Sequence, residues 1–281
     1  MKIDIAPFRS WIGRQDIVTD TLRPEPAAAL TAALDRTDPP KTGEPLPPLW
    51  HWIYFLPLHR QSELAADGHA KRGGFVPPIE LPRRMFAGAR LTFTRSLLIG
   101  DTARRTSTIA GLEAKEGKTG PLVFLRIRNE ISGSHGSMIE EQDIVYRDHP
   151  HPGTPLPAPR RPPAQAIWRH EMRADIALLF RYSALIFNAH RIHYDRDYAM
   201  KVEGYPGLVV HGQLVATLLA ELVRRNSTAK MTAFRFRSLR PLFDTAPFAL
   251  CGLPIGNRIS LWAEDADGAL AMEAEAEIEP A

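Results

Sequence analysis

The segment F-N-A-H-R-I-H-Y-D, residues 187–195, gathers an amide, two imidazoles and a carboxylate in one short stretch. His190 and His193 stand three residues apart, so on a helix they would share a face and could bind a metal with Asp195 or His211. An H-x-x-H spacing without a glutamate between its histidines is weak evidence for a metal. The same side chains suit proton transfer, because imidazole titrates near neutral pH. A third interpretation is a polar turn in which His193 is only hydrogen-bonded.

Downstream, G-L-V-V-H-G leads into a stretch with helical periodicity that begins at Gly212 and runs to Arg225. The first backbone N–H groups of a helix have no partner within it, and the helix dipole favours negative charge there. Glycine also lets a ligand approach the backbone closely. The pattern predicts that the Gly212 amide stabilises a developing oxyanion, and a simple turn glycine is the alternative.

These residues need a scaffold, and the 281-residue chain, 44% hydrophobic, is long enough for two cores. A proline-rich stretch at 149–165 denies backbone donors to helix or sheet. It predicts a linker between an N-terminal module, 1–148, and a C-terminal module, 166–281. In each module a helical pattern, Pro24–Arg36 or Gly212–Arg225, precedes strand-like segments. The four such segments at 90–99, 102–114, 121–131 and 137–147 are expected to form an antiparallel meander. In the second module they lie at 233–239, 246–252, 258–264 and 269–278.

The two modules also show a weak internal repeat. Aligning Asp101 with Asp244 places Leu91 on Phe234, and both positions precede an apolar-to-turn transition. A long helix followed by an antiparallel sheet, present twice, predicts an α+β fold. We therefore expect a tandem, or double, hotdog in which each sheet wraps its helix.

Composition excludes several classes of protein. With 35 basic and 32 acidic residues the net charge is only +3, so no basic surface for nucleic acid is expected. The single cysteine, Cys251, excludes an internal disulfide and suggests a core position in a reducing compartment. No segment reaches the roughly 20 apolar residues of a membrane span, and the charged first residues do not resemble a signal peptide. A cytoplasmic location is expected.

The runs R-Y-S-A-L-I-F-N-A-H-R-I-H-Y-D and G-Y-P-G-L-V-V-H-G resemble the hydratase motif of the MaoC-like, (R)-specific enoyl-CoA hydratases, a hotdog family. The chain is more similar to the branch that holds hydroxyacyl-thioester dehydratase type 2 and the mesaconyl-CoA and itaconyl-CoA hydratases. L-P-R-R-M-F-A-G-A-R-L and L-R-P-L-F-D-T-A-P-F also resemble that branch. The resemblance implies reversible hydration of a 2-enoyl-CoA, with a short branched dicarboxylic acyl group such as mesaconyl-C4 or itaconyl.

Residue by residue, the family motif D-x-N-P-x-H places its histidine on His193 and its aspartate on Asn188. Its asparagine and proline fall on His190 and Arg191. The loss of the aspartate is the most serious departure, because an amide cannot accept and return a proton near neutral pH.

Two ways of replacing that carboxylate are open. In the first, His193 alone serves as base and acid while Asn188 orients the water. In the second, Asp195 or Glu203 supplies the carboxylate. We prefer the first, because the resembling branch carries asparagine at this position.

The resemblance then implies a mechanism in which His193 deprotonates a water held by Asn188 and the thioester oxygen is stabilised at Gly212. No metal or redox cofactor is expected, and the partner is the acyl-CoA substrate. The residues expected to bind it are Arg191, Arg84, His190, Tyr194 and His211. Candidates for the CoA phosphates are Arg224, Arg225 and Lys230, or Arg83, Arg84 and Arg90.

The first module has no N-x-x-x-x-H match, so we expect it to shelter the acyl group. Its aromatic run at 50–55 lines the acyl cavity or forms core. Three rival functions remain. One is a 3-hydroxyacyl-thioester dehydratase for another type of acyl chain, and one is a hotdog thioesterase, which would need a carboxylate where Gln213 and His211 stand. The third is a non-catalytic acyl-CoA binding module. The exposed sheet edges of such a fold suggest a homo-oligomer.

Overall fold

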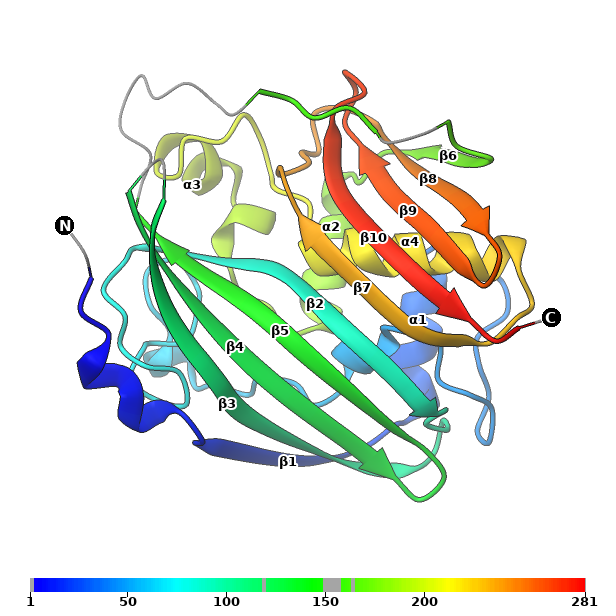
Figure 1. Ribbon diagram of the computed structural model, residues 1–281, viewed down its shortest axis with the longest axis horizontal. Helices are drawn as coiled ribbons and strands as arrows, with labels where there is room; N and C mark the ends of the chain where they lie inside the picture. The colour runs from blue at the N-terminus through cyan, green and yellow to red at the C-terminus, as the bar shows by residue number, and fades with distance from the viewer. Residues whose placement is uncertain (1–2, 118–119, 149–157, 163–164, 281) are drawn as a thin grey trace.

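The computed structural model describes residues 3–117, 120–148, 158–162 and 165–280. Within them, ten strands form one antiparallel sheet in the order β1-β3-β4-β5-β2-β7-β10-β9-β8-β6 (Figure 1). The first five are β1 (Gln15–Thr21), β2 (Arg83–Arg95), β3 (Thr102–Gly117), β4 (Gly120–Gly133) and β5 (Ser137–Arg147). The other five are β6 (Trp168–Met172), β7 (Met231–Ser238), β8 (Phe248–Ile255), β9 (Arg258–Glu264) and β10 (Leu270–Ile278).

Three of the four α-helices of the described residues lie in the second half of the chain. The α-helices are α1 (Pro24–Ala33), α2 (Ile176–Leu185), α3 (Arg196–Lys201) and α4 (Gly212–Asn226). The short 3₁₀ helices are η1 (Ala6–Trp11), η2 (Trp50–Ile53), η3 (Gln61–Glu63) and η4 (Arg191–His193). Most of the predicted linker, residues 149–157 and 163–164, lies outside the described residues.

The two halves of the sheet share one topology. Counted from the junction, the first half runs β2-β5-β4-β3-β1 and the second runs β7-β10-β9-β8-β6. β2 and β7 lie side by side at the junction (Figure 1), where Leu91 pairs with Phe234. A two-fold axis that exchanges the halves must pass through a pair of equivalent residues, and these two are the pair that the sequence repeat aligned.

The predicted simple meander is wrong in one respect. All four strands of the first half form, but β2 pairs with β5 and with β7, not with β3. Because β5 pairs with one edge of β2, the other edge of β2 is left to pair with β7 of the second half. β1 and β6, which the sequence patterns did not single out, are short edge strands beside β3 and β8.

The helix α4 forms the centre of the second half, and the sheet of β6–β10 curves around it (Figure 1). Every residue from Leu214 to Val223 is buried, so the helix has no solvated face there. This burial explains how a single helix can organise five strands. The predicted start at Gly212 is confirmed, as is the buried position of Cys251.

The first half has no comparable long helix among its described residues. α1 ends at Ala33, three residues earlier than expected, and Asp35 then adopts a left-handed φ of 55°. The stretch from there to β2 contains only the single-turn helices η2 and η3. The aromatic side chains Trp50 and Trp52 fill part of the space under this sheet, both less than one-tenth exposed. No helix in the described part of the chain is long and apolar enough to cross a membrane.

Candidate active site

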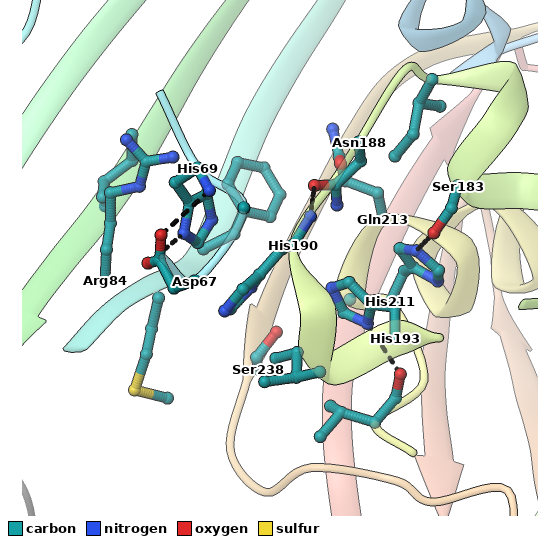
Figure 2. A pocket seen from close by; sticks show the side chains of 18 of the residues that line it. Asp67, His69, Arg84, Ser183, Asn188, His190, His193, His211, Gln213 and Ser238 are labelled. Carbon is teal, nitrogen blue, oxygen red and sulfur yellow. Dashed lines mark hydrogen bonds and ion pairs between the residues drawn. The ribbon is translucent and has the colours of Figure 1, made fainter. Parts of the chain in front are cut away.

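A cavity of about 1920 Å³ is lined by both halves of the chain. The first half contributes the loop 61–76 and the start of β2, and the second contributes the segment 186–194 and the start of α4. Figure 2 shows four histidine rings along its wall, His69, His190, His193 and His211. The cavity therefore joins the predicted motif to a loop that the sequence analysis did not consider.

His193 is held in its neutral form. Its Nδ1 lies 2.7 Å from the carbonyl oxygen of Val209. Because a carbonyl only accepts, Nδ1 carries the proton and donates it, and Nε2 keeps its lone pair. Burial lowers the pKa of His193 to about 4. At neutral pH the ring is unprotonated at Nε2, which is the state that a general base requires.

His211, predicted to bind substrate, packs against the base. Its ring stacks on that of His193 with centroids 3.7 Å apart and planes 17° from parallel. Its Nε2 is 2.8 Å from the hydroxyl of Ser183 on α2, and the residue is only 2% exposed. Burial holds the pKa of His211 well below its usual value. The ring thus stays neutral and fixes one face of His193.

The start of α4 offers backbone donors to the cavity. The helix has no side-chain cap and no acidic residue in its first turn. Around Gly212 there is room for a ligand, because a β-carbon added there would meet only the Ser238 hydroxyl at 3.4 Å and the Phe86 carbonyl at 4.0 Å. The Ser238 hydroxyl is itself buried without a hydrogen-bond partner. These groups suit an oxygen that gains negative charge.

The amide oxygen of Asn188 is hydrogen-bonded within the protein, and among the described residues its NH2 group is not. Its Oδ1 accepts a hydrogen bond from the backbone N–H of His190 at 3.0 Å, which shapes the turn before η4. Its NH2 group makes no hydrogen bond to the described residues, and the residue lines the cavity. This side chain can donate to a water or to the substrate but cannot accept a proton from either.

The two carboxylates proposed to compensate for Asn188 are engaged elsewhere. Asp195 caps α3 by accepting from the Tyr198 N–H and pairs with Arg191 at 2.7 Å. Glu203 pairs with Arg83 at 3.1 Å. The structure therefore offers no support for either as the missing acid.

Arg191 is also not where the sequence suggested. Its guanidinium binds Asp195 and the carbonyl of Ala66, lies 4.2 Å from the centre of the Tyr198 ring, and is absent from the described cavity lining. The prediction that Arg191 binds substrate is corrected: its contacts tie the motif to the first half. Tyr194 does line the cavity, and its hydroxyl donates to the Ala189 carbonyl at 2.9 Å.

Arg84 lies at the site, beside Arg83, which also lines the cavity. Arg84 lines the cavity and, among the described residues, has no acidic partner within ion-pair distance. Burial lowers the pKa of His69 and of His190, and the nearby Arg84 charge lowers both further. Of the other predicted phosphate ligands, Arg83, Arg90, Arg224 and Lys230 are paired with carboxylates.

The ligand set proposed for a metal does not converge, because Asp195 is turned to Arg191 and His211 to Ser183. A different set does lie together: ligand atoms of Asp67, His69 and His190 are all within 4.8 Å of one another. Sequence reasoning missed Asp67 and His69, whose signal was the D-G-H triplet at 67–69.

The ten-stranded sheet and its repeated topology define a double hotdog, and comparison with solved structures agrees. A solved structure described as a MaoC-like dehydratase superposes with a TM-score of 0.73 at 13% identity, covering 97% of this chain and 99% of that one. A Mycobacterium tuberculosis protein described as a double hotdog gives 0.56 at 15% identity, covering 95% and 96%. The predicted fold class is confirmed.

The family follows from sequence. Residues 49–244 match the model of hydroxyacyl-thioester dehydratase type 2, and the chain belongs to that family. It is 50% identical over 278 residues to the mesaconyl-C(4)-CoA hydratase of Chloroflexus aurantiacus, covering 97% of this chain and 98% of that protein. The mitochondrial hydroxyacyl-thioester dehydratase type 2 of Schizosaccharomyces pombe is 29% identical over 77% of this chain and 80% of its own. The resemblance inferred from the motifs is confirmed.

Proposed function

We propose that this protein is a hydro-lyase that reversibly hydrates a 2-enoyl-CoA carrying a free carboxylate, as in the conversion of mesaconyl-C4-CoA to citramalyl-CoA. The observation that carries the chemistry is the neutral His193, whose Nε2 lone pair is left free in a cavity beside the start of α4. The name and 50% identity of the Chloroflexus aurantiacus relative support the substrate class.

In the hydration direction, His193 Nε2 takes a proton from a water to which the Asn188 NH2 group donates. The water oxygen bonds to the β-carbon, and the double-bond electrons move into the thioester as an enolate. The Gly212 amide donates to the enolate oxygen. A proton then reaches the α-carbon, and dehydration reverses these steps. The reaction adds only the elements of water, so the proposal includes no metal or redox cofactor.

We place the free carboxylate of the substrate at Arg84. In mesaconyl-C4-CoA this group sits on the β-carbon, close to the attacking water, so its partner must also lie near His193. A hydrogen bond to a charged group contributes about 1.5–3 kcal/mol, which corresponds to about 10- to 100-fold in affinity. Arg84→Gln should therefore raise KM for mesaconyl-C4-CoA by about that factor and leave crotonyl-CoA, which has no carboxylate, almost unchanged.

The test of the reaction is direct. Purified protein is incubated with mesaconyl-C4-CoA, itaconyl-CoA and crotonyl-CoA, and loss of enoyl absorbance is followed together with free thiol. We expect absorbance to fall without thiol release and His193→Ala to reduce kcat by about 10²–10⁴-fold, the usual contribution of a general base. Thiol release would indicate a thioesterase instead. The absence of an acidic residue from the first turn of α4 argues against that alternative. An unchanged His193→Ala variant would refute the proposed base.

Two further properties belong to this proposal. The single buried thiol of Cys251 suits a reducing compartment such as the cytoplasm. β1 and β6 end the sheet as edge strands, and such edges favour pairing with a second copy. Light scattering on the purified protein would measure the oligomeric state.

A further inference from the structure

The proposed reaction contains two proton transfers, one at the water and one at the α-carbon. His193 accounts for the first. The position where the family motif has aspartate is Asn188, which cannot transfer a proton, and Asp195 and Glu203 are paired with arginines. None of these three residues of the second half is therefore free to make the second transfer.

The first half contributes a hydrogen-bonded aspartate–histidine pair, Asp67 and His69, to the wall of the cavity. Asp67 accepts two hydrogen bonds from His69: from its backbone N–H at 3.0 Å and from ring Nδ1 at 2.8 Å. These bonds fix the orientation of the imidazole and place the proton on Nδ1, because an ionised carboxylate only accepts. Nε2 of His69 is left to exchange a proton with another group. Both residues line the cavity.

The loop that carries this pair is docked against the motif. The Arg191 N–H donates to the Asp67 carbonyl at 2.9 Å, and the Arg191 guanidinium donates to Ala66 at 3.1 Å. Gly68 has a φ of +89°, and a β-carbon there would lie 1.7 Å from the Ala189 carbonyl oxygen. Only glycine permits so close an approach, so the position of His69 is set by backbone contacts.

Ring contacts connect the pair to the base. The His69 and His190 centroids are 3.9 Å apart, and those of His190 and His193 are 5.5 Å apart. His69 and His193 are thus separated by one imidazole along the wall, as Figure 2 shows. Both histidines therefore line one wall of the same cavity.

We propose that His69, held by Asp67, is the second acid–base catalyst and exchanges a proton with the α-carbon of the substrate. This inference rests on the proposed hydratase function. In hydration, His193 gains the water proton and oxygen bonds to the β-carbon; Nε2 of the neutral His69 then takes a proton from solvent and passes it to the enolate α-carbon. In dehydration, Nε2 of the neutral His69 takes the α-proton, and Nε2 of His193 takes a proton from solvent and passes it to the departing hydroxyl. Each ring then returns to its starting state by exchange with solvent. Asp67 is a positioning residue in this scheme.

The test uses His69→Gln and Asp67→Asn, with His135→Gln as a matched control. His135 forms the same kind of pair with Asp101 at 3.0 Å but lies 62% exposed and outside the cavity lining. We expect His69→Gln to lower kcat by about 10²-fold or more, with KM changed less than about threefold. The control should match wild type. Asp67→Asn should lower kcat less, because the ring remains but its tautomer is no longer fixed.

Two readouts separate catalysis from a structural role. Dehydration of a 3-hydroxyacyl-CoA deuterated at the α-carbon should show a larger isotope effect in His69→Gln than in wild type, because breaking that C–H bond becomes rate-limiting. Added imidazole should restore activity to His69→Ala with saturation, since the lost ring leaves space in the cavity. Thermal melting of each variant reports whether the fold is intact.

Several results would overturn the inference. One is His69→Gln with near wild-type kcat. Another is a low kcat with neither a larger isotope effect nor rescue by imidazole. A third is stoichiometric binding of Zn²⁺ that is lost in Asp67→Asn, together with loss of wild-type activity in chelator, because a resident cation would occupy the lone pairs. If wild type itself hydrates none of the three enoyl-CoA thioesters, the proposed function fails first, and the two failures are thereby distinguished.

Discussion

Activity should persist to acidic pH and then fall as His193 takes up a proton. The base is active only when Nε2 is unprotonated, so kcat/KM of the free enzyme decreases as the pH drops through the pKa of this ring. Burial lowers that pKa from 6.5 to about 4, although the hydrogen bond to the Val209 carbonyl works in the opposite direction. The decrease should therefore be centred near pH 4.

The magnitude separates the buried ring from an ordinary histidine. A lowering of the pKa from 6.5 to about 4 corresponds to about 3 kcal/mol against the charged form. At pH 5.5, a group with a pKa of 4 is about 97% neutral, whereas one with a pKa of 6.5 is about 9% neutral. Activity at pH 5.5 should thus remain close to its plateau, not fall about tenfold.

The assay is kcat/KM for mesaconyl-C4-CoA from pH 4 to 8, measured by loss of enoyl absorbance. Circular dichroism at each pH, and return of samples to pH 7 before assay, identify loss caused by unfolding. A midpoint near 6.5 in protein that remains folded would refute the reasoning. It would mean that His193 is hydrated in solution and not desolvated by His211 and the cavity wall.

Three further predictions concern stability. The pKa values of His190, His193 and His211 are lowered by burial, so the unfolded chain binds more protons below pH 6.5. The free energy of unfolding should fall by up to about 1.4 kcal/mol per pH unit for each ring between pH 6.5 and 4.5, and equal urea midpoints at pH 7 and pH 5 would contradict this. Gly68→Ala should cost about 2–3 kcal/mol and reduce kcat. Gly13→Ala, with a similar φ of +87° but nothing within 4 Å of the new β-carbon, should show only the backbone part in the same melting experiment. Glu221→Ala should lower the free energy of unfolding by about 3–5 kcal/mol, because it removes the carboxylate that pairs with two arginines and accepts the Trp50 indole N–H at 3.0 Å. A change below about 1 kcal/mol would show that this buried network contributes little.

Part of the candidate site could be predicted from the sequence, because its residues are close together along the chain. The motif from Asn188 to His193 and the H-G pair at the start of a helical pattern each lie within one short segment, so both can be recognised without the fold. The mostly apolar run after Gly212 then indicated where α4 begins, because ten consecutive buried positions require mostly apolar side chains. The alignment of Leu91 with Phe234 likewise anticipated the two-fold relation of the halves.

Contacts between distant segments decided the rest. Nothing in the composition of D-G-H at 67–69 shows that Gly68 will lie against Ala189 and bring His69 beside His190, since that contact depends on how a long loop closes. The sequence also placed Arg191 at the substrate because it is adjacent to the motif, whereas the chain turns it toward Asp195. Side-chain direction and loop closure depend on the packed fold. The sequence alone therefore determined the fold class and the family and located the motif of Asn188 and His193, while the tertiary structure decided which groups from the first half share the cavity with that motif.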